Sequence, residues 1–121
     1  DTFNNKNQLS VPINIINPSE LFIENIYNIP NPMKDITYFT FKSNKSFNEI
    51  EIDIYNQIGL KVFSNIIKDD FEPGFNSSLN WNGLDSKSNK LPNGSYFYKL
   101  KISSSLYSKK YEYVGKLVIL K

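Results

Sequence analysis

Chemistry that depends on an imidazole or a thiol is not available to this chain. Its 121 residues include no His and no Cys, so the commonest general base, the thiolate nucleophile and the most frequent transition-metal ligands are missing. Serine is abundant, but a serine nucleophile needs a neighbouring base, and no spacing in the sequence assigns a Ser–Lys pair. The sequence therefore predicts a domain that is not an enzyme, with no catalytic residues.

Acidic side chains form two candidate cation sites. Asp69, Asp70 and Glu72 supply oxygen ligands of the kind that Ca²⁺ prefers, but neighbouring side chains on a loop usually diverge. Residues 85–89 place oxygens at alternate positions, as in part of a calcium loop, whereas Lys87 and the absence of a distal Glu favour a polar hairpin loop. We expect no cofactor and no metal.

Lysines interleaved with aromatic residues mark the last third of the chain. Such a pattern occurs on platforms for single-stranded nucleic acid, yet lysines on a solvent face also prevent edge-to-edge aggregation of sheets. The 14 basic residues against 12 acidic ones give a net charge of only +2, and all of them are Lys, although Arg is the better phosphate ligand. We predict no nucleic-acid partner. The lysines concerned are Lys99, Lys101, Lys109, Lys110, Lys116 and Lys121.

The closing stretch is the strongest candidate for a binding element. Residues 116–121 place four apolar β-formers between two lysines, at a position where chains usually fray. Two interpretations stay open. The stretch is either a strand that completes a sheet, or an exposed edge that a partner recognises by adding a strand.

Period-two alternation indicates the elements that must carry this stretch. Helical periodicity is nearly absent, and short alternating runs are separated by turn formers every eight to twelve residues, as in a sandwich or small barrel. With 40% hydrophobic and 15% aromatic residues the chain has enough apolar surface for a core. Strands are predicted at about 22–29, 36–43, 50–55, 60–66, 79–81, 96–102 and 109–120, with a loop at 69–74 and a hairpin turn at 103–105.

The third and fourth strands allow a prediction of register. If Ile54 faces Leu60 and Ile52 faces Val62, the apolar pairs share one face. Asp53 then lies opposite Lys61 on the polar face.

The domain organisation is read from the first residues. The chain begins with Asp1 and has no apolar run near the ~20 residues of a membrane span. We expect a fragment in which residues 1–22 are the end strand of a preceding domain, with Val11, Ile13 and Ile15 alternating, plus a linker. Residues 23–121 form the remaining domain.

Six segments in a fixed order carry a resemblance to a known family. They are Tyr27–Met33, Thr37–Phe41, Ile52–Asn56 with Gly59, Trp81–Gly83, Leu91–Tyr98 and Lys116–Lys121. From about Ile26 onward the chain resembles the C-terminal signal domain, or Por secretion tail, of proteins exported by the type IX secretion system of Bacteroidetes. The family motif residues are Pro30, Asn31, Pro32, Gly59, Trp81, Gly83, Gly94, Tyr96 and Tyr98.

The resemblance implies a fold, a function and partners. The fold is an all-β, seven-stranded immunoglobulin-like β-sandwich with antiparallel Greek-key strands. The domain directs its passenger through the periplasm and the outer-membrane translocon, and an outer-membrane β-barrel shuttle and a sortase then receive it at the cell surface. The implied recognition strand consists of Lys116, Leu117, Val118, Ile119, Leu120 and Lys121.

A second resemblance concerns the parent protein. Residues 1–5 and the alternation to Ile15 are similar to the segment before this domain in the gingipain-type sortase of the same system, although Met33 stands where the family usually has Phe. That resemblance implies a cysteine protease-like domain upstream. The alternative is a hook-cap-type or adhesin immunoglobulin-like domain, which shares the patterns at 81–83 and 96–98.

Overall fold

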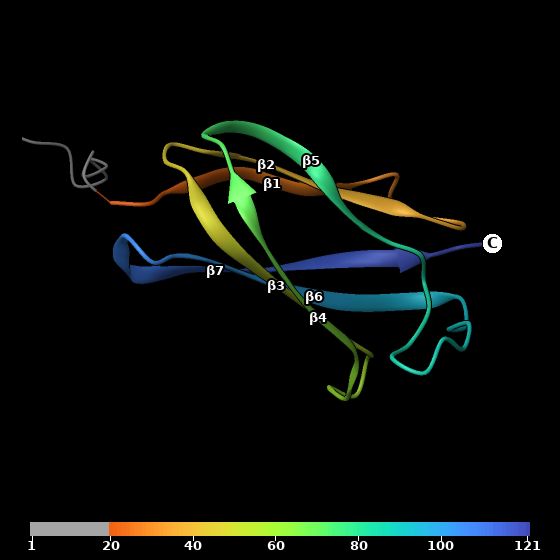
Figure 1. Cartoon of the computed structure of the whole chain (residues 1–121). Coiled ribbons are helices and arrows are strands. Elements are labelled where there is room, and N and C mark those ends of the chain that lie inside the picture. The colour runs from red at the N-terminus through yellow and green to blue at the C-terminus, as the bar shows by residue number, and fades with distance from the viewer. Residues whose placement is uncertain (1–19) are drawn as a thin grey trace, which may run out of the picture.

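Two antiparallel sheets packed face to face form the domain (Figure 1). The computed structural model describes residues 20–121, apart from the side chains of residues 107–109, so most of the segment predicted as an end strand and linker lies outside the described residues. The smaller sheet has the order β1-β2-β5 and the larger sheet the order β4-β3-β6-β7. The strands are β1 (Ile23–Ile29), β2 (Thr37–Ser43), β3 (Phe47–Tyr55), β4 (Lys61–Phe71), β5 (Gly74–Trp81), β6 (Gly94–Ser104) and β7 (Tyr107–Ile119).

The alternating residues of β3 and β6 build the centre of the larger sheet. The two strands pair directly, with Ile52 opposite Leu100 and Ile54 opposite Tyr98, and the inward side chains of both strands are buried as predicted. Successive side chains of a strand point to opposite faces, so one alternating run fills the core and exposes its polar partners. The all-β sandwich predicted from the sequence is therefore confirmed, and its architecture is consistent with an immunoglobulin-like fold.

Aromatic side chains join the two sheets across the core. The ring of Phe39 in β2 meets that of Tyr98 in β6 edge to face, with 4.8 Å between centroids. The ring of Trp81 in β5 packs against those of Phe63 and Tyr96 on the larger sheet, with 6.0 and 6.5 Å between ring centroids. Such pairs add about 0.5–1.5 kcal/mol each beyond the area they bury. They fix the separation of the sheets without a disulfide.

The β3–β4 turn explains the glycine of the third motif. The side-chain Oδ1 of Asn56 accepts hydrogen bonds from the backbone N–H groups of Ile58 and Leu60. Gly59 has a φ of 89°, a conformation that glycine adopts without strain. Asn56 and Gly59 together set where β4 begins.

The predicted register between β3 and β4 is wrong. Ile54 pairs with Phe63 and Tyr55 pairs with Lys61, so a β-bulge absorbs Val62. A bulge shifts the parity of the strand that follows it. Phe63 therefore points inward, whereas Leu60, predicted to face Ile54, is 59% exposed and Ile66 is 52% exposed.

Two boundaries also differ from the prediction. β4 continues to Phe71 and β5 begins at Gly74, so the predicted loop at 69–74 shrinks to a tight connection. The β6–β7 turn lies at residues 105–106 and not at 103–105, since pairing extends the hairpin to its tip. Local composition favoured loops here, and cross-strand pairing overrides that preference.

Tyr98 occupies space that only a glycine leaves free. It lies opposite Gly115 of β7, and a Cβ at that glycine would stand 2.3 Å from the Tyr98 ring. The Tyr98 side chain is 2% exposed, and burial, together with Tyr113, raises the pKa of its hydroxyl to about 12. The hydroxyl therefore stays protonated, and the ring closes the core over β7.

We predict that Gly115→Ala destabilises the domain by about 1–3 kcal/mol, because the added methyl group forces the Tyr98 ring out of a packed position. Urea unfolding followed by fluorescence measures the change. Val114→Ala, on the exposed side of the same strand, is the control and should shift stability by no more than about 0.5 kcal/mol. Equal stability of Gly115→Ala and the wild type would contradict the packing described here.

Candidate functional site

The motif residues that are separated in sequence gather at one end of the sandwich. We call this the motif end and define it by residues 30–36, 56–60, 82–94 and 116–121. Figure 1 shows the connections at 30–36 and 82–94 near the C-terminus, on the right of the view, and the β3–β4 turn below them. The turns at 44–46, 72–73 and 105–106 lie at the opposite end. The sequence pattern gave the order of the motifs but not their convergence.

The turn after β5 explains the Trp-Asn-Gly motif. The indole Nε1 of Trp81 donates a hydrogen bond to the backbone oxygen of Leu84 at 2.9 Å. Gly83 has a φ of 78°, and a Cβ there would lie 3.4 Å from the Cε of the buried Met33. The glycine is thus favoured by the positive φ of the backbone, while a Cβ at this position would only make ordinary van der Waals contact with Met33.

The segment before β6 holds the end of the chain. The hydroxyl of Tyr96 donates to the backbone oxygen of Pro92 at 2.7 Å, which fixes the bend. Asn93 accepts a hydrogen bond from the backbone N–H of Lys121, and the Lys121 ammonium donates to the backbone oxygen of Leu91. Residues 91–93 therefore attach the last residue to the body of the domain.

The outer edge of β7, facing away from β6, is sealed by the β1–β2 connection. The Asn31 amide donates to the backbone oxygen of Lys116 at 3.3 Å and accepts from the N–H of Val118 at 3.0 Å. Met33 donates its N–H to the oxygen of Val118 at 2.8 Å and accepts from the N–H of Leu120 at 2.9 Å, as a parallel bridge. Two residues thereby satisfy the backbone groups that an added strand would use.

Side chains of the closing stretch alternate between core and surface. Leu117 and Ile119 are completely buried, while Lys116, Leu120 and Lys121 are exposed. Burying each aliphatic side chain stabilises the fold by about 1.5–3 kcal/mol, and each hydrogen bond of the seal adds about 0.5–1.5 kcal/mol. The stretch is therefore an integral strand, and only its exposed half is accessible to a partner.

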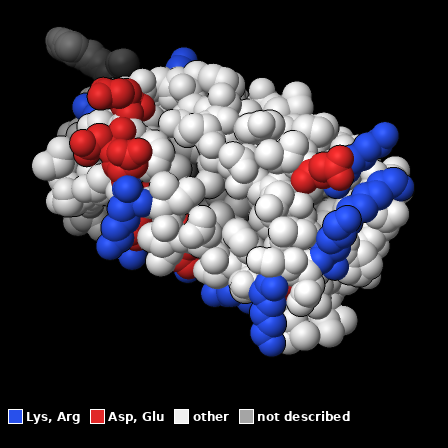
Figure 2. All heavy atoms as spheres, turned by 45° about the vertical axis from the view of Figure 1, so that its right-hand side comes forward, with Lys and Arg blue, Asp and Glu red and all other residues white. Residues whose placement is uncertain are grey.

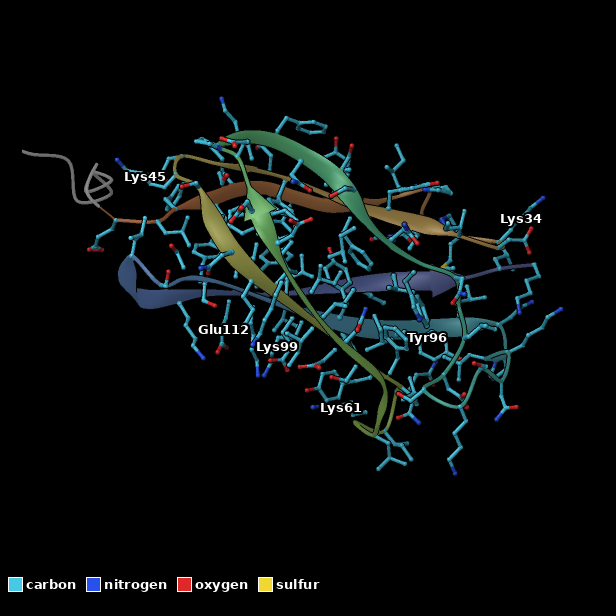
Figure 3. All side chains as sticks on the ribbon, viewed as in Figure 1. Lys34, Lys45, Lys61, Tyr96, Lys99 and Glu112 are labelled. Carbon is cyan, nitrogen blue, oxygen red and sulfur yellow. The ribbon has the colours of Figure 1, made fainter. Side chains whose placement is uncertain are left out.

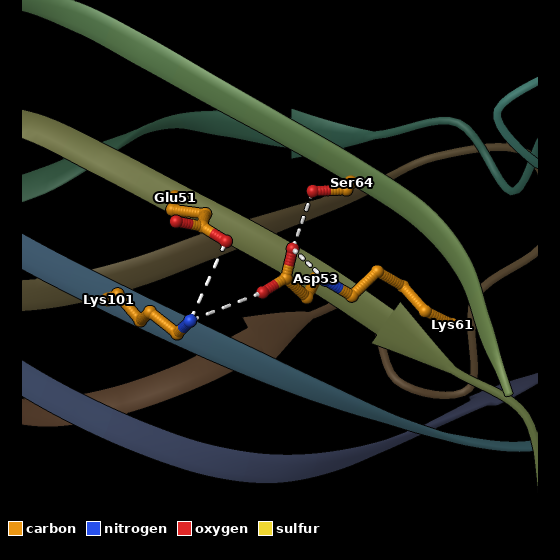
Figure 4. A network of polar contacts seen from close by, with 5 residues as sticks. All are labelled: Glu51, Asp53, Lys61, Ser64 and Lys101. Atoms are coloured by element: carbon orange, nitrogen blue, oxygen red, sulfur yellow. Dashed lines mark hydrogen bonds and ion pairs between the residues drawn. The ribbon is translucent and has the colours of Figure 1, made fainter. Parts of the chain in front are cut away.

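An unexpected buried charge lies on the outer face of the larger sheet. Asp53, predicted to be a solvent-facing partner of Lys61, has no exposed surface. Its Oδ1 accepts a 2.6 Å hydrogen bond from the Ser64 hydroxyl and lies 3.7 Å from the Lys61 ammonium (Figure 4). Lys101 lies 3.9 Å from Oδ2 and 3.7 Å from Glu51. The long lysine side chains cover the carboxylate that the alternation placed at the surface.

Competing effects set the pKa of Asp53. Burial acts to raise it, but hydrogen bonding by Ser64 and Glu51, together with the ammonium groups of Lys61 and Lys101, outweighs burial and lowers the pKa below its usual value. The carboxylate is thus ionised and paired. The network serves to hold β3 against β4 and β6.

The other candidates from the sequence have structural surroundings. Asp69 and Asp70 are exposed on β4, and within residues 20–121 no three acidic side chains come together as a metal site would require. The carboxylate of Asp85 accepts hydrogen bonds from the backbone N–H groups of Asn89 and Lys87. These hydrogen bonds lower the pKa of Asp85 and shape the turn. No helix in this described part is long and apolar enough to cross a membrane.

Sequence reasoning missed the role of Asn31 and Met33. Both belong to a segment that was recognised only as part of a motif, and their partners lie 85 or more residues away. The one available signal is the side chain of Asn31, which can both donate and accept and can thus imitate a backbone edge. Fold and site together define a β-sandwich module whose clustered motif residues hold a few exposed side chains at one end.

Comparisons with known proteins identify the family. Residues 13–119 match the CHU_C type IX secretion signal domain. The crystal structure of dimeric latent PorU from Porphyromonas gingivalis is similar, with a TM-score of 0.63 and 20% identity over 91% of this chain and 10% of that chain. PorZ of P. gingivalis, described as an essential surface component of the type IX system, gives a TM-score of 0.43 and 14% identity over 79% and 11%. No curated protein sequence matches.

The family match spans most of the chain, so the chain belongs to the CHU_C family of type IX secretion signal domains. It is a non-catalytic signal that targets its protein for export, which implies recognition by the secretion machinery and passage across the outer membrane to the cell surface. This family favours the secretion signal over a hook-cap-type or adhesin domain. The chain spans about a tenth of the PorU chain, and at 20% identity that likeness concerns the fold.

We predict that Asn31→Ala weakens the seal on β7. The variant loses the two side-chain hydrogen bonds to Lys116 and Val118, and we expect a loss of about 1 kcal/mol in stability, with faster amide exchange at Val118. Hydrogen exchange by NMR makes the measurement. The control is Asn80→Ala, at an exposed position in β5. Unchanged amide exchange at Val118 in Asn31→Ala would contradict the prediction.

We predict that Asp53 contributes to the pH dependence of stability. Its pKa is lower in the folded state, so the contribution is complete above the unfolded value of about 3.9 and is lost as the pH falls through the folded value. Asp53→Asn should cost about 1–3 kcal/mol at pH 7 and flatten the acid side of the stability curve. Urea unfolding from pH 2 to 7 tests this. The side chain of Glu51 is 22% exposed and pairs with the same Lys101. Glu51→Gln should therefore lower the free energy of unfolding at pH 7 by less than Asp53→Asn does.

Proposed function

We propose that the type IX machinery recognises this domain through residues 116–121, held in place as the last strand of the sandwich. The partners are the outer-membrane translocon, then an outer-membrane β-barrel shuttle and a surface sortase, and the domain serves as a targeting and anchoring element. The family membership supports the role. The exposed side chains of Lys116, Leu120 and Lys121 at the end of the molecule support the site.

One observation carries the proposal of this site. Leu120 is 55% exposed although it directly follows the buried Ile119, and its backbone N–H is fixed by Met33. A rigidly held aliphatic side chain beside the cation of Lys121 loses little conformational entropy when a partner covers it. The strand is thus preorganised for contact.

The parent protein is a further part of the proposal. The resemblance of residues 1–15 to the segment before this domain in a gingipain-type sortase supports a parent with a cysteine protease-like domain upstream, in which the signal domain stays attached as an anchor. In ordinary cargo the domain is removed after export. The residues that carry this resemblance lie outside the described part of the chain.

The test separates contact from folding. Deletion of residues 116–121 would remove the buried Leu117 and Ile119, so substitutions of exposed residues are the cleaner change. We predict that Leu120→Asp with Lys121→Glu, in the chain fused behind a reporter, reduces surface display in a bacterium with a type IX system at least about tenfold. Protease accessibility of the reporter on whole cells gives the measurement.

Controls on the same strand complete the experiment. Val114→Asp with Lys110→Glu alters exposed residues of β7 away from the motif end and should leave display unchanged. A photo-crosslinking residue at position 120 should capture an outer-membrane β-barrel protein. Normal display of the Leu120/Lys121 variant, with its thermal unfolding midpoint retained, would rule out this recognition site.

A further inference from the structure

The accessible part of the closing stretch is small. Leu117 and Ile119 face the core, and Asn31 and Met33 occupy the backbone edge between residues 116 and 120. A partner that added its own strand at this position would first have to displace the seal. What remains for a partner is the row of side chains at Lys116, Leu120 and Lys121, together with whatever surrounds them.

Two further lysines, Lys34 and Lys90, adjoin residues that hydrogen-bond to the closing stretch. Lys34 directly follows Met33, which bridges the last strand. Lys90 directly precedes Leu91, whose carbonyl accepts the Lys121 ammonium. Figure 2, turned so that this end comes forward, shows several lysines there with an acidic group beside them, while further acidic groups gather at the other end. Asp35, directly after Lys34, is exposed as well. Residues far apart in sequence thus share one cationic face.

Exposed apolar side chains also lie at the motif end. Ile58, in the β3–β4 turn, is 80% exposed, and Leu60 and Leu120 are more than half exposed. A hollow of about 280 Å³ opens between that turn and residues 92–96. Its rim includes Asn93, which also holds the backbone of Lys121. The motif end therefore carries exposed apolar side chains and a hollow as well as its lysines.

We propose that the export signal is this composite face and not the closing stretch alone, and that its partner is a protein surface with carboxylates around a projecting apolar side chain. The proposal rests on the proposed function and extends its site to Lys34, Lys90 and the hollow beside Ile58. Opposite charges around an apolar contact speed association and select the partner. The ion pairs found among the described residues lie on the outer sheet face at Glu49, Glu51 and Asp53, and within this part of the chain none of them involves Lys34 or Lys90.

The test uses charge reversal outside residues 116–121. Lys34→Glu with Lys90→Glu, in the full chain behind a reporter, should lower surface display at least about fivefold. It should also weaken binding to the purified, detergent-solubilised β-barrel shuttle by a similar factor, with a difference that shrinks as salt rises. Lys45→Glu with Lys110→Glu is the matched control. Lys34 and Lys45 lie at opposite ends of the molecule (Figure 3), and the control should behave as the wild type.

The variants distinguish a failure of the composite face from a failure of the proposed function. If the Leu120/Lys121 variant fails while the Lys34/Lys90 variant is displayed normally, the proposed function stands and the composite face is wrong. If both are displayed normally, the proposed function fails as well. An equal loss in the Lys45/Lys110 control shows an effect of net charge and overturns the proposal. A third measurement is co-sedimentation of the wild type with phosphatidylglycerol vesicles. If Lys34→Glu/Lys90→Glu abolishes this co-sedimentation and leaves shuttle binding unchanged, the partner of this face is a lipid surface and not a protein.

Discussion

The closure of the outer edge of β7 is the constraint on which the rest of this structure depends. A strand at the edge of a sheet exposes N–H and C=O groups that invite pairing with other chains. Here Asn31 and Met33 satisfy those groups between residues 116 and 120. The seal converts a stretch that would fray into a rigid surface, and it brings the β1–β2 connection to the end of the chain.

The seal also explains why several motifs lie together. Met33 bridges Ile119, and its buried side chain packs against the turn that contains Gly83. Trp81 fixes the turn that contains this glycine, and Tyr96 fixes the bend that holds Lys121 through Asn93. These motif residues therefore have structural roles at this end of the domain. For the recognition proposed above, such rigidity is an advantage, because little entropy is lost on binding.

Prediction from sequence worked where side-chain period decides the outcome. The burial of the alternating residues in β3 and β6 follows from strand geometry alone, and the turn at Gly59 follows from its need for a positive φ. It failed at β4, where one inserted residue reversed the parity and exposed Ile66. It failed also at Asp53. Alternation assigned this side chain to solvent, but lysine side chains of the neighbouring strands cover it.

Residue types and their alternation were enough to predict an all-β domain with no imidazole or thiol chemistry, and motifs in a fixed order pointed to the family. The grouping of the motifs at one end and the half-buried, hydrogen-bonded state of residues 116–121 became visible only in the folded chain. The difference lies in the sequence separation of the interacting residues. Strand period and turn conformation are set by neighbouring residues, whereas the contact of Leu91 with Lys121 joins positions 30 residues apart across the β6–β7 pair, and that of Asn31 with Lys116 forms only when both sheets have packed.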